Sequence, residues 1–211
     1  MHPNPAFRQE PNFTNLLLAR KRGFGTLCIN SDPAPLLSHI PFVIDDAGKS
    51  AELHLVRSNP IARTTDKPTP AVISISGPDA YVSPDWYGDP AQVPTWNYVA
   101  VHLRGTLHPM DQGLMREHLD RVSAHFEAML FPKRPWTTAK MPTDVLDRLM
   151  RTILPFRFEI TEIEGTWKLN QNKTDQARAG ASHEIRTSPV GHETAVLAAL
   201  MMGGVQEIDN R

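Results

Sequence analysis

The sequence predicts a mainly β protein of the α+β class, in which an antiparallel barrel core carries peripheral helices. After one N-terminal helix, strand-like segments fill most of residues 24–108, and short turns join several of them. Helical periodicity dominates only after residue 110. Strands joined by short turns cannot form the crossovers of a parallel sheet, and early strands followed by late helices are typical of α+β and barrel folds.

The elements follow from local patterns. The first helix is expected over Asn12–Lys21, because apolar residues share one side and basic residues load its last turn before Gly23. Five strands are expected next, over Phe24–Asn30, Pro35–Ile44, Ala51–Arg57, Ala71–Ser76 and Tyr98–His108. A last strand is expected over Phe156–Ile163, and further helices over Asp111–Leu130, Pro142–Leu154, Gln176–Ala181 and Val196–Met202.

Length and composition limit the function classes. The 211 residues fit one domain, expected over 1–181, with a C-terminal tail or helix over 182–211. A formal net charge of −1 makes direct DNA binding unlikely or weak. No segment is long and apolar enough to cross a membrane, and no signal-peptide pattern precedes the first helix, so a cytoplasmic protein is expected.

One segment concentrates the aromatic residues of the chain. Residues 77–102 hold all 3 tyrosines and half of the 4 tryptophans. Such a concentration favours an aromatic surface for a planar ligand or a partner chain. Within it, Trp96 and Tyr98 point to one side of an extended chain and Asn97 to the other, although filling of the core would use the same residues.

Polar residues beside the strands suggest contacts to a ligand. Arg57, Ser58 and Asn59 combine a guanidinium, a hydroxyl and an amide, which suits a phosphate, or they form an ordinary strand end before an Asn-Pro turn. His39 is either a donor to a ligand or a half-buried strand histidine. The run from Trp167 to Lys173 suits a heterocycle edge or a phosphate, although a polar loop looks similar.

Metal and hydrolase chemistry are not expected. His102 and His108 lie about 20 Å apart on an extended strand, and His118 and His125 lie about 10.5 Å apart on a helix. No HExxH motif, nucleophile elbow or GxGxxG fingerprint occurs in the chain. The single cysteine, Cys28, allows no intrachain disulfide.

Five segments together resemble the PaiB-like family, which belongs to the FMN-binding split β-barrel group. They occur in the family's order and cover roughly residues 5–180, at positions 39–42, 57–60, 77–87, 93–102 and 167–172. The resemblance implies a six-stranded antiparallel split barrel and a homodimer with FMN at its interface. It also implies a regulatory role related to transcription or protease synthesis.

The resemblance also assigns the candidate cofactor contacts. The flavin phosphate maps onto Arg57, Ser58 and Asn59, and the ring onto Ser38, His39, Trp96, Asn97, Lys168, Gln171 and Asn172. The alternative is an FMN-dependent oxidoreductase or flavin reductase acting on a small substrate, because similar barrels carry out such reactions. No acid–base pair in the sequence identifies a substrate, so the catalytic residues stay unknown.

Overall fold

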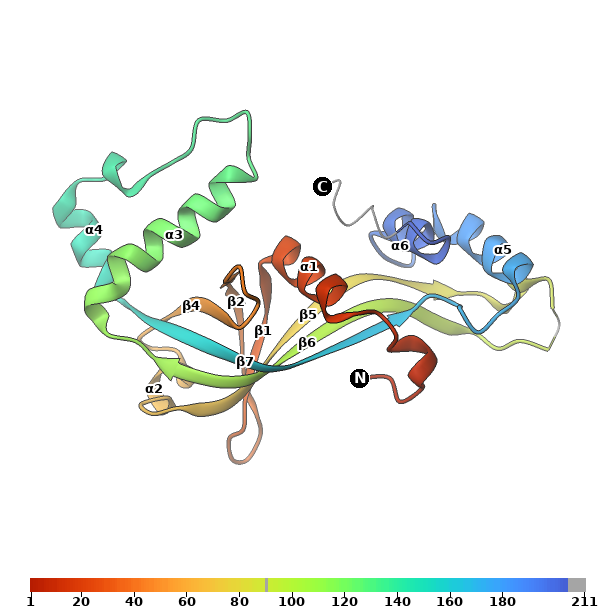
Figure 1. The fold of residues 1–211 in the computed structure, drawn as a ribbon, viewed down its shortest axis with the longest axis horizontal. Coiled ribbons are helices and arrows are strands. Elements are labelled where there is room, and N and C mark those ends of the chain that lie inside the picture. The colour runs from red at the N-terminus through yellow and green to blue at the C-terminus, as the bar shows by residue number, and fades with distance from the viewer. Residues whose placement is uncertain (90, 205–211) are drawn as a thin grey trace. The chain divides into compact units, whose positions relative to one another are not determined.

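The computed structural model describes residues 1–89 and 91–204, which form two compact units. Of the described residues, those of 1–22, 75–102 and 163–204 form one unit, and those of 23–74 and 103–162 form the other. Three long strands contribute residues to both units (Figure 1). These are β5 (Thr69–Val82), β6 (Thr95–Pro109) and β7 (Ile153–Lys168).

The strands form one sheet in the order β2-β1-β5-β6-β7-β4-β3, and the short β8 (Gly191–His192) pairs with β5. The remaining strands are β1 (Phe24–Ile29), β2 (Leu36–Pro41), β3 (Val43–Ile44) and β4 (Ser50–Val56). The predicted class, a split barrel with an antiparallel sheet and peripheral helices, is confirmed. The predicted count of six strands is wrong, because the path contains seven.

The additional strand arises within the predicted segment Pro35–Ile44. The segment divides at Phe42, whose backbone N–H donates to the carbonyl of Gly23 at 2.8 Å. Before this point β2 pairs with β1, and after it β3 pairs with β4. One continuous apolar run therefore serves two different neighbours in the sheet.

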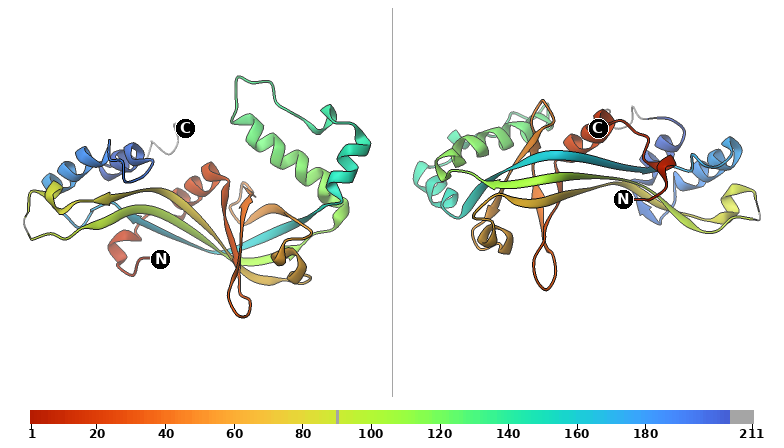
Figure 2. Two further views of the ribbon diagram at one scale, coloured as in Figure 1. Left: turned by 180° about the vertical axis from the view of Figure 1, so that it is seen from behind. Right: turned by 60° about the horizontal axis from the view of Figure 1, so that its bottom comes forward.

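The unit that contains β1 to β4 also carries two helices of the second half of the chain. These are α3 (Met115–Ala128) and α4 (Thr143–Met150), which Figure 2 shows from two further directions. Short helical turns accompany them, at α2 (Pro60–Thr64), η3 (Gln112–Leu114) and η4 (Thr138–Lys140). Along β4, Ala51, Leu53 and Leu55 are buried, and the residues between them face the other way.

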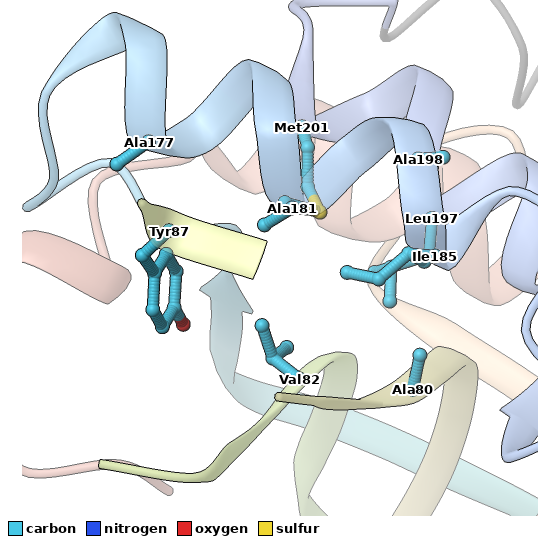
Figure 3. Packing of buried hydrophobic residues seen from close by; sticks show 9 residues of the cluster. All are labelled: Ala80, Val82, Tyr87, Ala177, Ala181, Ile185, Leu197, Ala198 and Met201. Carbon is cyan, nitrogen blue, oxygen red and sulfur yellow. The ribbon is translucent and has the colours of Figure 1, made fainter. Parts of the chain in front are cut away.

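The other unit is built from α1 (Asn12–Arg22), η1 (Pro5–Phe7), η2 (Pro84–Tyr87), α5 (Asp175–Ile185) and α6 (Thr194–Met201), with the adjoining parts of the long strands. In Figure 3, side chains from α5 and α6 point toward β5 and η2 and form one apolar cluster. Its members are Ala80, Val82, Tyr87, Ala177, Ala181, Ile185, Leu197, Ala198 and Met201. The predicted C-terminal helices are therefore confirmed and lie in a packed core.

The boundary predicted between residues 181 and 182 falls within α5, and residues 205–211 of the predicted tail lie outside the described residues. Within the described part of the chain, no helix has the length and apolar character that crossing a membrane requires.

Candidate functional site

The predicted site residues fall into two groups, one in each unit. Ser38, His39, Arg57, Ser58 and Asn59 lie on β2 and at the end of β4. The other group lies around the start of β6 and the end of β7, and comprises Trp96, Asn97, Lys168, Gln171 and Asn172.

His39 is part of an exposed aromatic pair. It lies on β2 opposite Thr26 of β1, and its Nδ1 lies 3.0 Å from the Thr26 hydroxyl. The imidazole stacks on Phe24 with ring centroids 6.4 Å apart and planes inclined by 20°. Phe24 is 56% exposed, and His39 is exposed as well. The two rings therefore offer a flat surface of the kind on which a planar ring system packs.

Ser38 and Asn59 form a hydrogen-bonded pair on the opposite face of β2, because Ser38 and His39 are consecutive residues of that strand. The Asn59 amide nitrogen donates to the Ser38 hydroxyl at 2.9 Å, and its oxygen accepts from the backbone N–H of Ile61, which caps α2. The nitrogen and the oxygen of the Asn59 amide are thus both engaged in hydrogen bonds within the fold. The Ser38 hydroxyl accepts this bond and keeps its own hydrogen for a further partner.

Arg57 and Ser58 are exposed in the turn after β4. The Arg57 guanidinium donates to the carbonyl oxygen of Arg151 at 2.6 Å and to the Gln112 side-chain oxygen at 2.8 Å. A guanidinium carries five N–H donors, so donors remain for a bound anion. Arg57 thus ties β4 to η3 and to the end of α4, and it can also contact a phosphate.

In the other unit, Trp96 and Asn97 lie on opposite faces of β6, as their alternation predicts. Trp96 is 45% exposed and meets Tyr81 edge to face at 6.3 Å. Asn97 is 0% exposed, and its amide nitrogen lies 3.5 Å from the Met201 sulfur of α6. Among the described residues its side-chain oxygen has no partner. A ligand on the Trp96 face would not touch Asn97, whose cofactor contact stays a prediction.

Lys168 is the last residue of β7, and Gln171 lies in the turn that follows it. The Lys168 ammonium donates to the Thr95 hydroxyl and lies 6.0 Å from the ring centroid of Phe7. Burial, followed by the nearby Lys173 charge, lowers the pKa of Lys168. Gln171 closes the turn after β7 by donating to the carbonyl oxygen of Trp167 at 2.6 Å and accepting from the N–H of Leu169 at 2.8 Å.

Asn172 is the one predicted residue that lines a pocket at the start of α5. This pocket has a volume of about 380 Å³. Lys173 also lines it; its ammonium contacts the Gln92 side-chain oxygen and lies 5.3 Å from the Tyr87 ring centroid. Burial raises the pKa of Tyr87. Tyr87 and Lys173 were not predicted as pocket residues, although both lie in segments with a predicted role, residues 77–102 and 167–173.

Glu52, His54, His118 and Arg121 form a further cluster, which joins β4 to α3 through hydrogen bonds and was not predicted from the sequence. No spacing along the chain reveals it, because 64 residues separate the two histidines. Among the described residues, no group of three or more potential ligands could hold a metal ion.

Sequence and structural comparisons identify the class of protein to which this fold and these residues belong. The family model described as "Putative FMN-binding domain" matches residues 1–162. The chain therefore belongs to this family. The match ends before the last residues of β7, so Lys168, Gln171, Asn172 and the two C-terminal helices lie outside it.

Individual relatives extend this result. The chain is 26% identical over 158 residues to "Protease synthase and sporulation protein PAI 2" of Bacillus subtilis (strain 168), covering 74% of this chain and 75% of that protein. It is also 26% identical over 207 residues to an uncharacterized protein of Aspergillus fumigatus, covering 75% and 79% of the two chains.

Two solved structures share the fold at low sequence identity. The FAD and heme binding protein from Mycobacterium smegmatis superposes with a TM-score of 0.54 at 18% identity, covering 81% of this chain and 77% of that one. The flavocytochrome Anf3 from Azotobacter vinelandii superposes with a TM-score of 0.55 at 10% identity, covering 79% and 72%.

Proposed function

We propose that this protein binds FMN and acts as a PaiB-type regulator with a role in transcription or protease synthesis. The family and the split-barrel fold support a flavin, and the likeness to PAI 2 of Bacillus subtilis supports the regulatory role. The observation that carries the proposal is the exposed stack of His39 on Phe24. It is a flat aromatic surface within the family's matched region.

The residues of this unit fit the cofactor. Phe24 and His39 would pack against the isoalloxazine ring. Ser38 points to the opposite face of β2, so its contact with the ring stays a prediction. Arg57 and Ser58 would bind the phosphate, since an arginine forms charge-assisted bonds with phosphate oxygens. FMN should consequently bind more tightly than riboflavin, which lacks the phosphate, and equilibrium titrations followed by flavin fluorescence measure the two affinities.

The same surface supports a homodimer with FMN at its interface. On β2, β1 and β5, Leu37, Cys28 and Val72 form one row, and His39, Thr26 and Ser74 form the next. With His39 neutral, none of these six residues carries a formal charge. Leu37 is nevertheless 65% exposed, so an apolar side chain stands open to solvent on this face. A second copy can pack on this face without like charges meeting across a two-fold axis.

Leu37→Glu tests the dimer, because it would place two carboxylates near each other at a two-fold interface. We expect the variant to sediment as a monomer and to lose most of its FMN. Phe131→Glu is the matched control, since Phe131 is 87% exposed but lies outside β1, β2 and β5. Its mass and FMN content should stay those of the unchanged protein. A Leu37→Glu variant that remains dimeric would contradict the proposed interface.

The flavin spectrum of the FMN-loaded protein after addition of NAD(P)H distinguishes a regulator from an enzyme. NAD(P)H added to the loaded protein without another protein present should leave the flavin spectrum oxidised if the cofactor has a regulatory role. Rapid bleaching that recurs over many cycles with an electron acceptor would favour the reductase instead.

A further inference from the structure

Helix α3 is attached to the sheet through polar side chains. The inner residues of β4 enter the core, while Glu52 and His54 face α3. Only two residues of α3 are fully covered, Met115 at 1% and His118 at 0% exposure. A histidine thus occupies a position at which a helix on a sheet usually places an apolar side chain.

Four side chains form a continuous hydrogen-bonded chain. Arg121 of α3 binds Glu52 through both nitrogens of its fork, with Nη2 2.9 Å and Nε 3.2 Å from Oε2. The same carboxylate oxygen lies 3.2 Å from Nδ1 of His118. Nε2 of His118 then lies 3.0 Å from Nδ1 of His54, with ring centroids 5.2 Å apart and planes at 77°.

The geometry limits the number of protons that the pair can carry. A carboxylate only accepts hydrogen bonds, so Nδ1 of His118 holds a hydrogen. In the neutral ring Nε2 then accepts, and Nδ1–H of His54 donates to it. One extra proton can bind to Nε2 of His54, the ring nitrogen that is not hydrogen-bonded to His118. A second one would place N–H groups of both rings against each other across a distance of 3.0 Å.

The surrounding charged groups do not raise the number of protons that the histidine pair can carry. Burial and then the neighbouring His118 lower the pKa of His54 to about 4, and burial lowers the pKa of His118 despite the Glu52 carboxylate. Other charged groups lie near Glu52 and Arg121. They are Glu117 of α3, 3.6 Å from Arg121, Arg157 of β7 in register with Glu52, and Asp45, which lines a pocket of about 120 Å³ with Glu52 and Arg121. Opposite charges are thus interspersed around the Glu52 end of the hydrogen-bonded chain.

We propose that the Glu52–His118–His54 chain is a proton-sensitive latch, which holds α3 on β4 at neutral pH and releases the helix on acidification, when both rings become cationic. Release would expose the outer face of β4 while its inner face stays in the core. The latch is independent of flavin binding, because none of its residues belongs to the candidate cofactor contacts.

Hydrogen exchange of the full chain at pH 7 and at pH 4.5, corrected for intrinsic exchange rates, tests this proposal. The α3 amides should lose protection by up to about tenfold per pH unit for each linked proton, while amides of β4 stay protected. Equal α3 protection at the two pH values would overturn the latch. So would simultaneous loss in α3 and β4, which would indicate global unfolding.

His54→Asn separates the latch from general acid sensitivity. The asparagine amide can replace Nδ1–H as donor to His118 but does not bind a proton, so α3 should stay protected to lower pH than in the unchanged protein. His183→Gln is the control, since His183 of α5 is 84% exposed and lies outside the Glu52–His118–His54 chain, and it should leave the transition in place. An unchanged transition in His54→Asn, or its loss in His183→Gln, would contradict the assignment.

Should His54→Asn fail to fold, the unchanged protein still decides the question. The ring signals of His54 and His118 in NMR spectra should titrate together with the loss of α3 protection. If both rings titrate while α3 stays protected, the latch is refuted.

Discussion

Single side chains decide how the N-terminal helix is fixed to the long strands of its unit. The indole nitrogen of Trp167 donates to the Asn15 side-chain oxygen at 2.8 Å, and both residues are buried. A Cβ on Gly165 would lie 2.0 Å from that same oxygen, so the glycine makes room for the asparagine. The sequence predicted the helix and the strand but not this polar contact, because the partners lie 152 residues apart.

Trp167→Phe should lower the free energy of unfolding by about 2–4 kcal/mol, since it leaves a cavity and a buried oxygen without its donor. Trp96→Phe is the control, because Trp96 is 45% exposed, and should change it by less than about 1 kcal/mol. Urea unfolding of both variants without ligand gives the comparison. Equal losses would show that the Trp167 contact contributes little.

Two histidines also make the stability depend on pH. The pKa of His54 falls to about 4 in the folded protein, and that of His118 is lowered as well. Between the folded and unfolded pKa values the unfolded state binds more protons, so stability is full above about pH 6.5 and declines as the pH falls toward 4.

The free energy of unfolding should therefore drop by about 2 kcal/mol between pH 7 and pH 5 from His54 alone. Urea titrations at the two pH values measure the drop, and His54→Asn should reduce it. Stability that is constant over this range, or that rises on acidification, would contradict the neutral histidine pair.

At the scale of elements, the sequence predicted most helices and strands but made three strands too short. Segment 71–76 was expected to end before Gly77, whereas β5 continues to Val82. A Cβ on Gly77 would lie only 2.9 Å from the Val99 Cβ, so this glycine permits close packing within its unit and does not end the strand. Local propensity cannot distinguish these two uses of glycine, because the neighbouring strand decides between them.

Gly23→Ala and Gly88→Ala form a matched pair that measures such a contact. Both glycines have positive φ, +52° and +65°, so alanine strains the backbone at each by about 1 kcal/mol. A Cβ at Gly23 would also approach the Phe126 ring of α3 to 2.7 Å, whereas Gly88 has no atom within 4 Å. Thermal unfolding should show the larger loss for Gly23→Ala. Equal losses would mean that Phe126 moves aside without cost.

At the scale of the whole molecule, the sequence predicted the fold class through its order of strands and its family segments. It could not predict how the site residues divide. Asn59 caps α2, Gln171 closes a turn and Asn97 lies beneath α6, whereas His39 and Ser58 stay exposed. Residue type and order are the same for a ligand contact and for a structural hydrogen bond. Only the three-dimensional neighbours separate the two roles.

The central claim is that this chain holds FMN, and the visible absorption of the purified native protein tests it most directly. We predict a flavin spectrum, with a cofactor that is released on denaturation and identified as FMN, and recovery of the spectrum when FMN is added back. A colourless protein that takes up no added FMN would contradict the account.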